Sequence, residues 1–230
     1  MTDELSDRDL RAALDGVVTD PAWLADAVHR VSARPAAIGA LFPSVSRRCG
    51  RGPLPPGPPG LTGWTVDDAG RALLLTALPL RGPALAAEAG LLYRCGDAAE
   101  KRAVLRALPW LDLGDGGVEL LHDAIRSNDP RLVAAALGPY AARLAGPMWR
   151  QAVLKCVFMD IPLSQVSGLA ARADGELGRM LADLAAERRA AGRPVPAAAA
   201  LLAQLTGGSP GRSGAAEEAS RCGSSTRIFT

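Results

Sequence analysis

The sequence has few aromatic residues, few histidines and almost no lysine. Aromatic side chains make up 4% of the 230 residues, 2 histidines occur, and Lys101 and Lys155 are the only lysines, so arginine supplies nearly all basic groups. The excess of alanine, glycine, proline and arginine is typical of a GC-rich bacterial genome, which lowers the significance of any single arginine. The net charge of +2 and the scattered basic residues argue against a nucleic-acid-binding protein.

Long apolar runs are also missing. The best candidate for a membrane span, residues 72–93, is interrupted by Pro79, Arg81 and Pro83 and falls short of the roughly 18 apolar residues that a span needs. The first ten residues are polar and acidic, unlike a secretory signal. The 4 cysteines are far apart and form no C-x-x-C pair, which is typical of free structural thiols in the cytosol. We therefore expect a cytoplasmic protein without a membrane span.

Sequence signatures of cofactor chemistry are absent as well. There is no phosphate loop, dinucleotide fingerprint, nucleophile elbow or H-E-x-x-H motif, so we predict no cofactor. Asp26-x-x-His29 and Glu119-x-x-His122 each place a carboxylate and a histidine on one helix face, as in carboxylate-bridged metal proteins. Those proteins also need a glutamate from each of two further helices. We therefore interpret His29 and His122 as surface histidines and predict no metal site.

Helix signals recur along most of the chain with no strand pattern between them. Aspartate-proline and glycine-proline pairs, capping residues and apolar stripes at helical spacing mark one helix after another. We therefore predict an all-α fold, a stack of antiparallel helices that could extend as an α-solenoid. The expected starts are at Asp20, Thr65, Pro83, Asp97, Asp115, Asp129, Gly146, Ile161 and Asp174.

Composition divides this chain into four predicted parts. Residues 1–48 form an N-terminal helical segment, and residues 49–63 form an exposed linker rich in proline and glycine. Residues 64–206 form the main helical domain, which ends with a short helix at 197–205, and residues 207–230 form a disordered tail rich in glycine and serine. The linker could dock a proline-binding partner, although a plain spacer is the simpler interpretation.

The strongest site candidate is Lys155. Between Trp149 and Met159 only Arg150, Gln151 and Lys155 are polar, so we expect this helix to be central and buried. A buried lysine without a partner is costly. Lys155 should therefore pair with a carboxylate, reach solvent at the edge of the bundle, or line a pocket.

Other polar residues of the same region allow two interpretations each. Arg126 could bind an anion or cover the carbonyls that end its own helix, and Asn128 is explained by helix capping alone. Trp149 could stack on a ligand, but a core anchor is the simpler interpretation. A candidate ligand-binding set follows, with no catalytic residue assigned. Its members are Arg126, Asn128, Trp149, Gln151, Lys155 and Arg172.

The combined pattern from Thr65 to Val195 resembles the EboA family of bacterial proteins. The residues that carry the resemblance are R-S-N-D at 126–129, Trp149, L-K-C-V-F at 154–158, Pro162-Leu163, Gly168-Leu169, Arg172, Glu176-Leu177 and E-R-R-A-A-G-R-P-V at 187–195.

The resemblance implies an all-helical protein encoded in a gene cluster for the biosynthesis or trafficking of a specialised metabolite. It offers no catalytic residues to carry over. It favours a soluble accessory or scaffold protein that binds another protein of the cluster or a small metabolite. The alternative is an enzyme on a small polar or phosphorylated metabolite, with Lys155 and Arg126 or Arg172 converging around one pocket as anion ligands.

Overall fold

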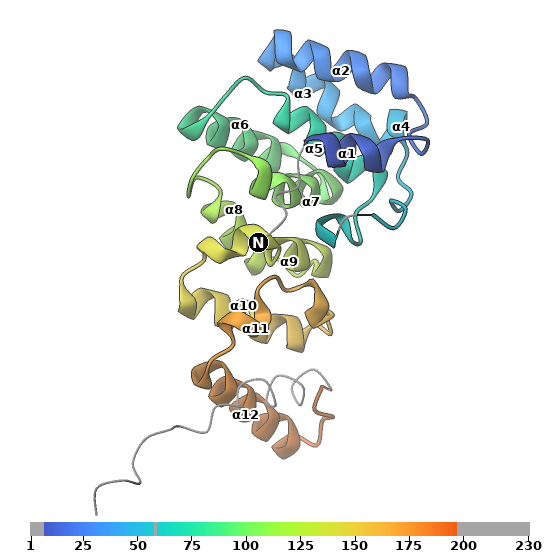
Figure 1. Cartoon of the computed structure of the whole chain (residues 1–230). Coiled ribbons are helices and arrows are strands. Elements are labelled where there is room, and N and C mark those ends of the chain that lie inside the picture. The colour runs from blue at the N-terminus through green and yellow to red at the C-terminus, as the bar shows by residue number, and fades with distance from the viewer. Residues whose placement is uncertain (1–6, 58, 197–230) are drawn as a thin grey trace, which may run out of the picture.

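The computed structural model describes residues 7–57 and 59–196 and shows helices stacked along one direction (Figure 1). Throughout these residues no strand forms, and the one isolated β-bridge joins Pro53 to Thr65. The predicted all-α fold is confirmed for this part of the chain. The helix predicted at 197–205 and the tail predicted at 207–230 lie outside the described residues.

The N-terminal segment is a set of short helices that pack beside the stack. Asp20 caps its longest helix by accepting a hydrogen bond from the backbone N–H of Trp23, as its position before Pro21 predicts. The helices and 3₁₀ turns are α1 (Asp7–Leu14), α2 (Pro21–Ala33), η1 (Pro35–Ala37), α3 (Ile38–Leu41), η2 (Phe42–Ser44) and α4 (Val45–Cys49).

The stretch rich in proline and glycine is attached to the rest of the fold at both ends. The Leu54 N–H donates to the carbonyl of Trp64, and the Val66 N–H donates to the carbonyl of Gly52. The segment also contains a short 3₁₀ turn, η3 (Pro59–Leu61), whose Leu61 side chain is buried. One cluster of buried apolar side chains includes residues on both sides of 49–63.

Helix α5 (Val66–Thr76) is the most enclosed element that the structure describes. Every residue from Val66 to Leu75 is buried, and α1, α2, α4 and α7 all contact the helix. The Thr65 and Asp68 capping box predicted from the sequence is present at its start. The helix predicted to be central, α10 (Gly146–Phe158), is less enclosed, because Gln151 and Phe158 are exposed.

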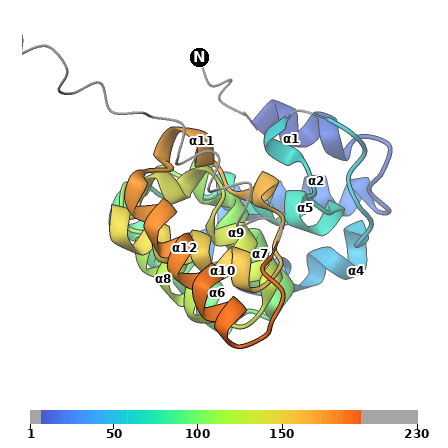
Figure 2. The same cartoon turned by 90° about the horizontal axis from the view of Figure 1, so that it is seen from below.

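The remaining helices continue the stack. Contacts run from α5 to α7, from α7 to α9, from α9 to α10 and from α10 to α12, so each level packs on its neighbours (Figures 1 and 2). The elements are α6 (Gly82–Cys95), α7 (Ala98–Ala107), η4 (Leu108–Trp110), α8 (Val118–Arg126), α9 (Pro130–Ala136), η5 (Pro139–Arg143), α10, η6 (Leu163–Gln165), α11 (Leu169–Arg172) and α12 (Gly175–Ala190).

Prolines decide two element boundaries. Gly138-Pro139 splits one predicted helix into α9 and η5, as expected from the missing N–H of proline. Ile161-Pro162 begins only the short turn η6 rather than a full helix. None of the helices in the described ranges combines the length and the apolar character that crossing a membrane requires.

Candidate functional site

Among the residues that the structure describes, Lys155 forms no ion pair with a carboxylate. It projects from α10 to the end of α8, where its ammonium donates to the carbonyl oxygens of Ile125 at 2.7 Å and Ser127 at 2.6 Å. The last carbonyls of a helix lack partners within the helix and carry partial negative charge, which a lysine satisfies. Lys155 is half-buried, so it combines these backbone contacts with partial exposure to solvent, and it ties α10 to α8.

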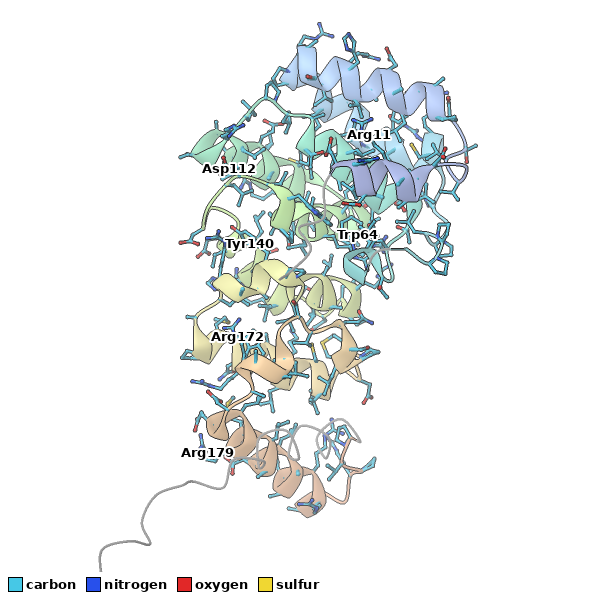
Figure 3. All side chains as sticks on the ribbon, viewed as in Figure 1. Arg11, Trp64, Asp112, Tyr140, Arg172 and Arg179 are labelled. Carbon is cyan, nitrogen blue, oxygen red and sulfur yellow. The ribbon has the colours of Figure 1, made fainter. Side chains whose placement is uncertain are left out.

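Arg172 and Trp149 form a second contact of this kind. The guanidinium of Arg172 donates to the carbonyls of Ala141 at 2.7 Å and Leu144 at 2.8 Å, which end η5 (Figure 3). It lies over the ring of Trp149, with 4.6 Å between Cζ and the ring centroid. Burial lowers the pKa of Arg172. Trp149 is itself buried, and its indole Nε1–H finds no acceptor among the described residues, so the ring is a core anchor.

The other members of the predicted ligand-binding set, Arg126, Asn128 and Gln151, lie at the surface. Arg126 is exposed and its guanidinium lies 3.7 Å from the carboxylate of Asp123, while Asn128 and Gln151 are exposed. Lys155 and Arg172 have separate backbone partners, those of Lys155 being the carbonyls on either side of Arg126, and none of the six residues lines either of the grooves described below. Their role in ligand binding stays a prediction.

The two histidines lie on different helices. His29 is exposed on α2, and the Nδ1 atom of His122 on α8 lies 3.3 Å from the carboxylate of Glu119. Within residues 7–57 and 59–196, no group of three or more histidine, cysteine, aspartate or glutamate side chains is arranged to hold a metal ion.

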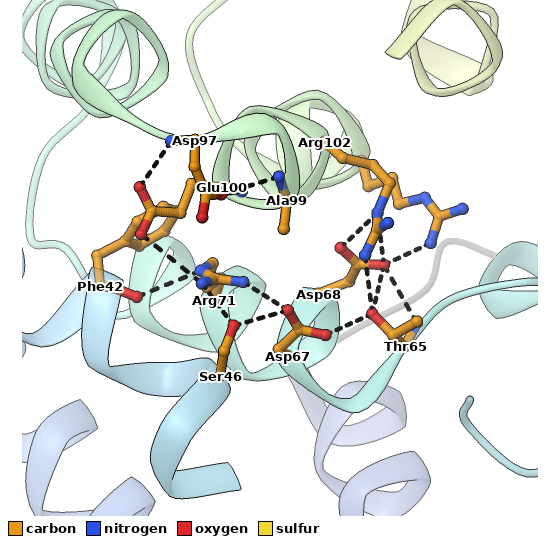
Figure 4. Close-up of polar contacts among 11 residues, drawn as sticks. Phe42, Ser46, Thr65, Asp67, Asp68, Arg71, Asp97, Ala99, Glu100 and Arg102 are labelled. Atoms are coloured by element: carbon orange, nitrogen blue, oxygen red, sulfur yellow. Dashed lines mark hydrogen bonds and ion pairs between the residues drawn. The ribbon is translucent and has the colours of Figure 1, made fainter. Parts of the chain in front are cut away.

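Helix α5 carries a buried group of charges that the sequence analysis did not single out (Figure 4). We call Asp67, Asp68, Arg71, Arg102 and Arg106 the α5 charge cluster. Asp68 is fully buried and receives Arg102 at 3.0 Å and Arg106 at 2.5 Å, both from α7. Arg71 is 1% exposed and binds Asp67 at 2.8 Å. The cluster therefore joins α5 to α7 through paired charges.

Neutral groups complete the hydrogen bonds of this cluster. The Arg71 guanidinium donates to the carbonyl of Phe42 and to the hydroxyl of Ser46, and Ser46 donates to Asp67. Burial by itself would raise the pKa of Asp67, but hydrogen bonds from Thr65, Ser46 and Arg71 hold it below its ordinary value. These ion pairs and hydrogen bonds offset the free-energy cost of burying the charges. Such complete pairing is typical of a structural network.

A groove of about 290 Å³ opens where the end of α6, the beginning of α7 and α8 meet. We call it the Tyr93 groove. Leu120 and the ring of Tyr93 form its apolar part, and the other lining residues are charged, which suits a small molecule that carries polar groups. Its lining residues are Tyr93, Arg94, Lys101, Glu119, Leu120 and Asp123.

Tyr93 is fixed at the centre of this groove. Its ring is buried, and its hydroxyl donates to the carboxylate of Asp123 at 2.9 Å. Burial raises the pKa of Tyr93, and the hydrogen bond to Asp123 raises it further, so the hydroxyl remains a donor. The Lys101 ammonium lies 5.1 Å from the centre of the Tyr93 ring. A buried ring and two charged side chains thus have defined positions around the groove.

A second groove, of about 400 Å³, lies between α1 and α2 and is lined mainly by apolar side chains, among them Leu14, Val18 and Leu24. The described thiols are not suited to nucleophilic catalysis at either buried position. Burial raises the pKa of Cys49 to about 11 and that of Cys156 to about 12, so both stay protonated at neutral pH.

Two signals in the sequence point to features that the sequence analysis missed. Asp67, Asp68 and Arg71 are charged residues directly before the apolar run Ala72–Leu75, and this conflict is typical of a buried ion-pair network. Lys101 is one of only two lysines, but the predicted ligand-binding set contains only the other, Lys155. Tyr93 and Asp123 are 30 residues apart, and their contact could not be read from spacing.

Comparison with known proteins adds one finding to this geometry. No curated protein and no solved structure matches the chain. A family model described as "Metabolite traffic protein EboA" matches residues 59–202, a range that includes α5, the Tyr93 groove and Lys155. Because this match spans more than half of the 230 residues, the chain belongs to the EboA family, whose description ties it to metabolites.

Proposed function

We propose that this protein is a non-enzymatic accessory protein of metabolite traffic that holds a small polar metabolite in the Tyr93 groove. The observation that carries the proposal is the groove itself, in which a fixed tyrosine ring, two cations and two carboxylates face a space of small-molecule size. The family description supports a metabolite as the class of ligand. In this role the protein would pass its ligand to other proteins of the same gene cluster in the cytoplasm.

The enzymatic alternative has less support. It needs Lys155 to converge with Arg126 or Arg172 around one reacting molecule, but Lys155 and Arg172 each bind backbone carbonyls of different elements. The buried thiols of Cys49 and Cys156 are protonated and enclosed. A binding role requires none of these groups to be reactive.

The test is to isolate the tagged protein from its native host under mild conditions and analyse what accompanies it. Native mass spectrometry should detect a bound small molecule that is lost from Tyr93→Ala, and pull-down should recover at least one protein of the gene cluster. A protein that carries no metabolite and recovers no cluster protein would contradict the proposal. Turnover of the isolated metabolite by the pure protein would favour the enzymatic alternative instead.

A further inference from the structure

The Tyr93 groove contains two cations with no acidic partner. Among the described residues, neither the Lys101 ammonium nor the Arg94 guanidinium is within ion-pair distance of a carboxylate, although both line the groove. Other arginines do form ion pairs: Arg143 pairs with Asp115, and Arg150 pairs with Asp174. Lys101 and Arg94 can therefore bind an anion on the α6–α7 wall of the groove, while Glu119 and Asp123 on the α8 wall make the groove neutral overall.

Lys101 has a defined position before any ligand arrives, and Arg94 has space along α6. Lys101 is half-buried and rests on the ring of Tyr93, which the hydrogen bond to Asp123 fixes. Arg94 folds back along α6 over Gly90, and a Cβ at Gly90 would lie 3.0 Å from Nη1 of Arg94. Gly90 therefore leaves the space that the guanidinium occupies. Side chains already ordered in this way lose less conformational entropy when they bind a ligand.

The opposite wall of the groove offers acceptors. One carboxylate oxygen of Asp123 accepts the hydrogen bond from the Tyr93 hydroxyl, and the other lies 3.7 Å from the Arg126 guanidinium. Each oxygen therefore keeps a lone pair that can accept a further hydrogen bond. Glu119 is mostly exposed, and its carboxylate faces His122. A ligand that places an anion between Lys101 and Arg94 can therefore direct hydroxyl groups towards Asp123.

We propose that the Tyr93 groove binds the anionic group of a small hydroxylated metabolite, a phosphate monoester or a carboxylate, through Lys101 and Arg94. Arginine and lysine are the side chains that bind both groups, the arginine through its planar pair of donors and the lysine as a point charge. The groove volume of about 290 Å³ is enough for a small molecule of this kind. This inference rests on the proposed function, because it names the ligand class of the same groove.

The test uses the full chain and three related probes at low ionic strength. Glycerol 3-phosphate carries the phosphate, glycerate carries the carboxylate, and glycerol carries neither. Isothermal titration or NMR titration should show binding of at least one of the two anions at millimolar concentration, little binding of glycerol, and weakening by added salt. Preference between the two anions distinguishes the phosphate from the carboxylate source. Equal binding of all three, or no binding of either anion, would overturn the inference.

Substitutions of Lys101 and Arg94 test whether these side chains bind the anionic group of the probe. The double change Lys101→Met with Arg94→Met should weaken binding at least tenfold, while Arg189→Met removes an equally exposed charge on α12 and should leave it unchanged. Unaltered affinity in the folded double variant, checked by its thermal melt, would exclude these residues. If the protein from the host carries a neutral metabolite, the ligand class fails while the proposed function stands.

Discussion

At the scale of single residues, Lys155 illustrates how a polar group on an apolar helix can be satisfied without a carboxylate. Its ammonium binds two carbonyls at the end of α8. Lys155→Met should therefore lower the free energy of unfolding by about 1.5–3 kcal/mol, the usual contribution of hydrogen bonds to a charged group. Urea unfolding followed by circular dichroism measures the change.

The second lysine supplies the matched control for that variant. Lys101→Met removes the same charge but only a contact with the Tyr93 ring, so it should cost at most about 1 kcal/mol. Equal unfolding midpoints for the two variants would show that the carbonyl contacts of Lys155 contribute nothing to stability.

Asp67 makes stability depend on pH. Its pKa in the folded protein lies below the ordinary 3.8, because the hydrogen bonds that it accepts outweigh its burial. The unfolded state therefore takes up this proton first as pH falls, and the stabilisation present above about pH 4 is lost progressively below it. Ser46→Ala removes one of those hydrogen bonds, brings the folded-state pKa of Asp67 closer to 3.8, and should therefore make the acid loss of stability smaller. Unfolding midpoints of the parent and of Ser46→Ala should be measured across an acid pH series. Parallel curves of midpoint against pH for the two proteins would contradict this prediction.

At the scale of helices, α12 depends on its first residues. Asp174 caps the helix by accepting the Leu177 N–H at 3.0 Å, and it receives Arg150 of α10 at 2.7 Å. Asp174→Ala should destabilise α12 by about 0.5–2 kcal/mol and loosen its attachment to α10. Hydrogen exchange of α12 amides should accelerate, while exchange in α5 stays as in the parent. Glu176→Ala, on the same turn but with its ion pair to Arg179 within α12 itself, should have the smaller effect.

Helices were predictable because their signals are local. Asp20, Asp97 and Asp174 all cap the helices that their positions indicated, and Gly138-Pro139 splits a helix for a reason contained in the dipeptide. The order of burial was not predictable in this way. Apolar composition favoured α10 as the central helix, whereas α5 is enclosed by segments distant in sequence, and its charges are paired across to α7.

The contacts of the candidate site residues were not predictable for the same reason. Lys155 and Arg172 looked like ligands because nothing local accounted for them, but their partners are carbonyls 28 to 31 residues away. The Tyr93 groove combines residues from three helices, none of which has a distinctive motif. Neither kind of contact is visible until the helices are stacked.

At the scale of the whole molecule, stability should fall towards α12. Helix α5 is packed on several sides, whereas α12 contacts mainly α10 and buries only Leu177, Leu181 and Ala185. Segments with few buried apolar contacts open at lower free energy than the rest. Native-state hydrogen exchange should therefore show the slowest amides in α5 and α7 and the fastest helical amides in α12. Uniform protection along the stack would mean that the molecule opens only as a unit.

The buried cysteines allow this stability gradient to be measured by the rate of thiol labelling. Cys49 lies in α4 beside α5, Cys156 lies in α10, and Cys95 is exposed. A thiol reagent added to the native protein should modify Cys95 at once and reach the other two only when their helices open, since both are enclosed and protonated. With Cys95 and Cys222 replaced by serine, the labelling rate at Cys156 divided by that at Cys49 reports which end of the stack opens first.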